Sequence, residues 1–225
     1  MNILLATKNG LVVCQHRQDG WHQVHRGLEG QNVTSVIARE GVILAGTGDG
    51  VFRSDDLGET WQEASDGLTI RHIRWLAYHP EISDFEFAGT EPAGIFFSRD
   101  GAASWQACPE VEENRRRYGW YLPYSPEAGC VRGFAHHGSR AYAAVEVGGV
   151  MVSDDSGETW KLAEGSRGYP HSAPPPFIHP DVHSIAIHPS SAEVVYAPTG
   201  GGFYCSWDGG VSWTQNYHCY CRRPG

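Results

Sequence analysis

Short apolar runs separated by polar turns recur along the whole chain. In each copy one run ends in Ala and a small residue, a turn follows, and a second run starts at or just after a Gly. The copies cover residues 5–12, 44–52, 87–96, 142–151 and 196–204. Apolar runs of this length bounded by Gly-rich turns predict adjacent antiparallel β-strands. The pattern therefore predicts five pairs of strands.

A further apolar strand precedes four of these pairs. It covers residues 33–38, 73–78, 131–135 and 182–187. The first pair lacks such a strand, because the sequence given starts at what is the second strand of the other units. The equivalent glycines Gly10, Gly50, Gly94, Gly149 and Gly202 follow one another at steps of 40, 44, 55 and 53 residues. Such steps suit four-stranded blades of about 40 to 50 residues, so we expect five blade units.

An eight-residue phrase, Ser-x-Asp-x-Gly-x-Thr/Ser-Trp, follows four of the strand pairs. It covers residues 54–61, 98–105, 153–160 and 206–213, and a decayed copy stands at 19–21. A short Asp side chain accepts hydrogen bonds within its own turn, Gly allows a backbone conformation that a Cβ resists, and Trp buries a large apolar area. The residues given these structural roles are Asp56, Gly58, Trp61, Asp100, Trp105, Asp155, Gly157, Trp160, Asp208, Gly210 and Trp213. Ala102 replaces Gly in the second copy, so we expect that turn to be the most distorted.

The phrase resembles the Asp-box, or BNR repeat, of sialidases, sortilin-type receptors, xyloglucanases and photosystem II assembly factors. The resemblance implies an all-β fold, a β-propeller of four-stranded antiparallel blades. Residues 219–222 begin like the missing first strand but stop too soon. We expect residues 1–225 to form a single domain that is part of a six- or seven-bladed ring. A five-bladed ring closed by a very short strand is the alternative.

Composition narrows the function. A formal net charge of −9 argues against a general nucleic-acid binder. No apolar run of about 18 residues is present that could span a membrane, and no export signal is visible, so we expect a cytoplasmic protein whose six cysteines are free thiols. His218, Cys219 and Cys221 lack the spacing of a zinc knuckle, and we expect no metal and no cofactor.

Two long insertions, 109–129 and 165–181, carry aromatic residues mixed with Arg and His. In propellers the loops leading into the first strands of the blades usually bind ligands, whereas Asp-box turns lie on the opposite side. The aromatic candidates are Tyr118, Trp120 and Tyr121. The alternative is that these aromatics form a lid packed on the propeller.

Alignment of the first strands by their apolar positions gives a column of Thr34, Arg74, Arg132 and His183. Arg matches a carboxylate or phosphate through two parallel hydrogen bonds, and sialidases bind their substrate carboxylate with three arginines. We therefore predict that Arg74, Arg132 and His183 bind a ligand, and that Arg74→Ala or Arg132→Ala abolishes binding while folding is kept. The alternative is that these cations pair with Asp or Glu between blades.

Evidence for catalysis is weaker. The Arg-Ile-Pro motif of sialidases is absent from the chain. A glycosidase needs two carboxylates across the scissile bond, and Glu146 and Asp181 are the better candidates, without a motif that singles them out. Two hypotheses result: a noncatalytic propeller that binds a partner protein or a small anionic ligand, and a sialidase- or xyloglucanase-like glycoside hydrolase.

Overall fold

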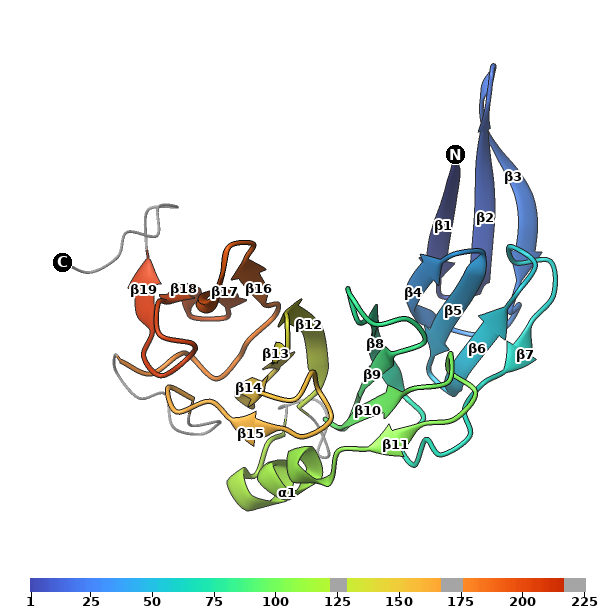
Figure 1. Cartoon of the computed structure of the whole chain (residues 1–225). Helices are drawn as coiled ribbons and strands as arrows, with labels where there is room; N and C mark the ends of the chain where they lie inside the picture. The colour runs from blue at the N-terminus through green and yellow to red at the C-terminus, as the bar shows by residue number, and fades with distance from the viewer. Residues whose placement is uncertain (122–128, 167–175, 217–225) are drawn as a thin grey trace. The chain divides into compact units, whose positions relative to one another are not determined.

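The computed structural model describes residues 1–121, 129–166 and 176–216 (Figure 1). The insertion residues 122–128 and 167–175 and the strand expected at 219–222 lie outside the described residues. The chain divides into two compact units. The first holds Met1–Tyr78, Ile82–Thr90 and Phe96–Ala107, and the second holds His79–Glu81, Glu91–Ile95 and the chain from Cys108 onward.

The first unit contains three antiparallel sheets, each with its strands in chain order. The first has three strands: β1 (Asn2–Thr7), β2 (Gly10–Arg17) and β3 (Gly20–Gly27). The second has β4 (Val33–Arg39), β5 (Val42–Thr47), β6 (Gly50–Ser54) and β7 (Gln62–Glu63). The third has β8 (Ile73–Tyr78), β9 (Glu86–Thr90), β10 (Ile95–Ser98) and β11 (Gln106–Ala107). The three-stranded first sheet is the one expected from the absence of a strand before residue 5.

The second unit contains two four-stranded antiparallel sheets and one described helix. The sheets are β12 (Val131–His137), β13 (Arg140–Val145), β14 (Gly149–Ser153), β15 (Lys161–Leu162), and β16 (Ala186–His188), β17 (Ser191–Thr199), β18 (Gly202–Ser206), β19 (Thr214–Asn216). The repeated antiparallel sheets confirm the predicted all-β, propeller-type fold class. The prediction of one domain stays a prediction.

The first insertion contains the helix α1 (Pro109–Tyr118), which lies against β15. The sequence pattern did not predict it, because it buries only Val111 and has no apolar period. Its signals are local: Pro109 in the first turn, acidic residues near the start, arginines near the end, and Gly119 in the left-handed conformation at φ 62°. Within the described residues no helix is long and apolar enough to cross a membrane.

Apolar side chains fill the space between consecutive sheets within each unit. One cluster joins β2 to β4 and β5 through Leu11, Val13, Val33 and Ala45. A second joins the β4–β7 and β8–β11 sheets through residues such as Leu44, Ile73, Leu76, Phe96 and Trp105. A third joins β12–β15 to β16–β19 through residues such as Tyr142, Val152, Val195 and Trp213.

The four Asp-box phrases connect the third and fourth strands of the four-stranded sheets. The Ser54 hydroxyl donates to Asp56 at 2.8 Å and accepts from the N–H of Gly58 at 2.8 Å. Asp56 also accepts from the N–H and hydroxyl of Thr60, at 2.9 and 2.6 Å. The same four bonds recur at 2.5 to 3.0 Å in the other three copies. The Asp side chain therefore stabilises each turn by accepting hydrogen bonds from residues on both sides of it.

The second copy keeps these bonds although Ala102 stands where the others have Gly. Its φ is 68°, against 93°, 101° and 90° at Gly58, Gly157 and Gly210, a conformation that is uncommon for a residue with a Cβ. The Ala102 N–H still donates to the Ser98 hydroxyl at 2.9 Å. The distortion expected for this turn is therefore limited to a smaller φ at Ala102, and the four hydrogen bonds of the turn are kept.

The cysteines differ in part from the sequence expectation. Cys14, Cys108 and Cys130 are free thiols, whereas Cys205 is disulfide-bonded. The prediction of free thiols is therefore wrong for Cys205. Spacing along the sequence does not reveal such a pair, because a disulfide depends on the distance between the two Cα atoms in the fold.

Candidate functional site

The predicted column coincides with one repeated irregularity of the fold. In β4, β8 and β12 the pairing skips one residue, which forms a β-bulge, and that residue is Thr34, Arg74 or Arg132. His183 holds the same place in the last sheet, since it follows Val182, which bridges Thr199. A bulge re-aims the side chain of its extra residue. The column therefore marks an equivalent, redirected position in each sheet.

Arg132 does not present a free cation. Its guanidinium forms an ion pair with Glu146, which lies in the turn between β13 and β14 and is only 5% exposed. The Cys130 thiol donates to the same carboxylate at 3.0 Å, and the Glu146 N–H donates to the Cys130 carbonyl at 2.9 Å. For Arg132 the structure corresponds to the alternative reading, in which the cation is paired with an acid.

His183 is also beside a carboxylate. Its Nε2 lies 3.1 Å from Asp181 Oδ1, with half of the His183 side chain exposed. The loop of Asp181 is tied to the turn of Glu146, because the Gly149 N–H donates to the Pro180 carbonyl at 2.9 Å. Gly200 is needed here, since a Cβ on it would come within 2.3 Å of Asp181 Oδ2. We call Arg132, Glu146, Asp181 and His183 the loop cluster.

The loop cluster contains the two carboxylates proposed from the sequence as catalytic candidates. One ligand atom from each of Glu146, Asp181 and His183 lies within 4.8 Å of the others. These atom types suit a metal, but the Arg132 guanidinium already occupies Glu146 and its positive charge opposes a cation there. The cluster contains two carboxylates, Glu146 and Asp181, against the one guanidinium of Arg132. An anionic ligand is therefore not favoured at this position.

Arg74 lies in the first unit, on β8, and is partly buried. Arg132 and His183 lie in the second unit. The structure thus brings together two of the three predicted column residues, and it joins them through acids rather than leaving them as a cationic pocket.

The aromatic candidates separate into one buried and two accessible residues. Trp120 is 2% exposed and packs on the turn of Glu146: a Cβ placed on Gly148 would lie 3.0 Å from the Trp120 ring. Tyr118 ends α1 with the Arg117 guanidinium 5.4 Å from its ring centre. Tyr121 is half exposed. Trp120 therefore packs against the turn that carries Glu146, in agreement with the alternative prediction that the aromatics form a lid. Of the three aromatic candidates, Tyr118 and Tyr121 are accessible.

Cys130 was missed by the sequence reasoning. Its only signal is its place directly before Val131, the first paired residue of β12. A lone cysteine carries no motif, so its contact with Glu146 could be found only from the fold.

No protein-family description and no curated protein matches this chain. Solved structures do match, and they are propeller proteins. An ancestral GH74 enzyme is 21% identical with a TM-score of 0.62, over 84% of this chain and 24% of its own. The GH74 xyloglucanase from Xanthomonas campestris is 17% identical with a TM-score of 0.60, over 95% of this chain and 36% of its own.

A third similar structure is YCF48 bound to D1 peptide, which is 14% identical with a TM-score of 0.59, over 95% of this chain and 64% of its own. At these identities the likeness shows the fold alone. The chain spans about a quarter of the ancestral GH74 enzyme and under two thirds of YCF48.

Proposed function

We propose that this chain belongs to an Asp-box propeller that binds a partner protein without catalysis, as part of a six- or seven-bladed ring. The observation that carries the proposal is the burial of Glu146 in its ion pair with Arg132. A glycosidase acid must donate a proton, a base must reach water, and a nucleophile must reach the sugar. A carboxylate that is paired with a guanidinium and shielded from solvent is not available for any of these roles.

The surface of the loop cluster suits a peptide. Asp181 and His183 are accessible, Tyr121 is half exposed beside buried Trp120, and the net charge is negative. Tyr side chains are enriched in protein interfaces and among the residues that contribute most to binding. YCF48, a similar propeller, is bound to a peptide, which supports this type of ligand. The hypothesis of a small anionic ligand has less support, because the Arg132 guanidinium is paired with Glu146 and the His183 ring lies beside Asp181.

The second candidate function is a glycoside hydrolase. The observation in its favour is that carboxylate oxygens of Glu146 and Asp181 lie within 4.8 Å of each other, and GH74 enzymes share the fold.

One pair of variants tests both functions. Asp181→Asn combined with Tyr121→Ala removes the accessible acid and ring, while Glu193→Gln removes a charge from the exposed Glu193 as a matched control. Crosslinking in extracts of the source organism, read by mass spectrometry, should identify a protein that the wild type and Glu193→Gln bind and the double variant does not. Equal crosslinking by all three would contradict the proposal.

The same proteins are incubated with xyloglucan and sialylated glycans. We expect no hydrolysis. Hydrolysis by the wild type and Glu193→Gln that the double variant lacks would replace the binding function by the enzymatic one.

A further inference from the structure

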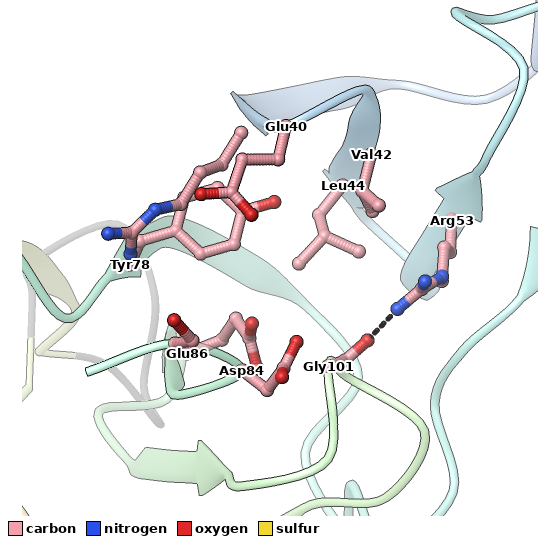
Figure 2. A pocket seen from close by; sticks show the side chains of 10 residues that line it. Glu40, Val42, Leu44, Arg53, Tyr78, Asp84, Glu86 and Gly101 are labelled. Carbon is pink, nitrogen blue, oxygen red and sulfur yellow. Dashed lines mark hydrogen bonds between the residues drawn. The ribbon is translucent and has the colours of Figure 1, made fainter.

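A second candidate site lies in the first unit, away from the loop cluster. It is a cavity of about 90 Å³ between the β4–β7 and β8–β11 sheets (Figure 2). We call it the Glu86 pocket. Its lining includes Glu40, Leu44, Arg53, Tyr78, Asp84 and Glu86. In Figure 2, Asp84 and Glu86 lie on one side of the pocket, and Glu40, Val42 and Leu44 lie on the other.

Two polar atoms of the pocket are buried without a hydrogen-bond partner among the described residues: Glu86 Oε2 and Tyr78 Oη. Glu86 is 2% exposed. A buried polar group without a hydrogen-bond partner is destabilising. The pocket therefore favours a ligand that donates hydrogen bonds to Glu86.

The charges around the pocket favour a positively charged ligand. Three carboxylates line it, and its two guanidinium groups are already engaged. Arg53 Nε and Nη2 donate to Asp55 at 2.9 and 2.7 Å, and its Nη1 donates to the Gly101 carbonyl. Arg39 lies over the Tyr78 ring at 5.8 Å. A positive ligand is thus attracted by Glu40, Asp84 and Glu86, and an anion is repelled.

We propose that the Glu86 pocket binds a primary ammonium group carried on a short aliphatic chain. The ammonium supplies three donors, which suit Glu86 Oε2 and Tyr78 Oη, and Val42 and Leu44 give methylene groups an apolar wall. A cavity of 150 Å³ accepts benzene, so by proportion 90 Å³ accepts about four non-hydrogen atoms. That is the size of n-propylammonium or of the end of a lysine side chain.

Binding to this pocket depends on pH. Burial, and after it the Asp84 carboxylate, raise the pKa of Glu86 to about 7, while Ser98, Ala102 and Arg53 oppose the shift. Glu40, Arg39 and Tyr78 also face the cavity. A cation binds the ionised form of Glu86, and an alkylammonium stays protonated up to a pKa near that of lysine, about 10.4. Affinity therefore increases from pH 5.5 to pH 8.

The test is a titration of the whole chain with n-propylammonium chloride, followed by amide NMR at constant ionic strength. At pH 8 we expect saturable shifts at Leu44 and Gly101, with binding at least tenfold weaker at pH 5.5 and at least tenfold weaker in Glu86→Gln. Glu59→Gln is the matched control, because Glu59 is an exposed carboxylate outside the pocket, and its affinity should equal that of the wild type.

n-Propanol has the same shape without the charge and should give no saturable shift. Equal binding of n-propanol, unchanged affinity in Glu86→Gln, or shifts that do not saturate would each overturn the proposal. If Glu86→Gln does not fold, the propanol comparison and the pH comparison on the wild type still decide it.

A capped Gly-Lys-Gly tripeptide distinguishes the two sources of the ammonium group. Binding at least as tight as that of n-propylammonium identifies the ligand as a lysine side chain of a protein. Binding of n-propylammonium alone identifies it as a free amine. Both results uphold an ammonium site, and neither depends on the proposed function of the loop cluster.

Discussion

Arg132 forms an ion pair with Glu146 across the bulged start of β12, and the carboxylate is almost fully buried. The pair changes the role expected for Arg132. A guanidinium that neutralises a buried acid contributes to folding, so Arg132→Ala cannot be a variant that tests binding alone.

We predict that Arg132→Gln lowers the free energy of unfolding by about 2 to 3 kcal/mol, because it leaves the Glu146 charge buried without its partner. Denaturant unfolding measures this. The double variant Arg132→Gln/Glu146→Gln should recover most of the loss, since no unpaired charge remains. A single variant as stable as the wild type would show that the ion pair does not form in solution.

The repeat could be predicted from the sequence because each blade uses the same local signals: paired apolar runs, a positive-φ turn and the Asp-box hydrogen bonds. The column at Thr34, Arg74, Arg132 and His183 was also visible, since equivalent residues recur at equivalent places. Its pairing with acids was only the alternative prediction, because no motif links Arg132 to Glu146, which lies in the turn between β13 and β14 of the same sheet. The Glu86 pocket was missed for the same reason: Glu40 and Asp84 carry no motif, and only the packing of two sheets brings them together with Glu86.

The tryptophans of the Asp-boxes should differ in their contribution to stability. Trp160 is 3% exposed and its Nε1 donates to the Gly157 carbonyl at 2.8 Å, so Trp160→Ala should cost about 3 to 5 kcal/mol. Trp61 is only partly buried against its apolar cluster, and Trp61→Ala should cost less. Denaturant titrations measure both losses. If the two variants lost the same free energy of unfolding, the burial of the tryptophan would not decide its contribution to stability.

The Asp-boxes make the fold sensitive to acid. Hydrogen bonds from Thr60 and Ser54 lower the pKa of Asp56 to about 2, below its ordinary value of about 3.9 in an unfolded chain. Because the folded-state pKa is the lower one, the stabilisation is present above about pH 4 and is lost as pH falls toward 2. Circular dichroism at pH 5, 4, 3 and 2 should show a loss of stability in this window. Asp56→Asn should be less stable at pH 5 and should lose less on acidification.

The state of the described cysteines can be mapped. Alkylation of the denatured, unreduced protein, followed by peptide mass spectrometry, should modify Cys14, Cys108 and Cys130 and leave Cys205 unmodified, because Cys205 is disulfide-bonded. Reduction before alkylation should make Cys205 reactive. Modification of Cys205 without reduction would show that the bond does not form. The result also tests the proposed cytoplasmic location, since disulfides are rare in reducing compartments.

Glu86 should make the protein less stable at higher pH. Its pKa is raised to about 7 in the folded state, chiefly by burial, and is about 4.3 in an unfolded chain. Because the folded state holds the proton more tightly, stability is greatest below about pH 4 and declines as pH rises through 7. Glu86→Gln carries no titrating proton and keeps the shape, so its Tm should exceed that of the wild type at pH 8. The two Tm values should converge at pH 4, where the wild-type side chain is neutral. A Tm difference that is the same at both pH values would mean that Glu86 does not change its protonation on folding, and the ammonium pocket would then lose the pH dependence argued for it.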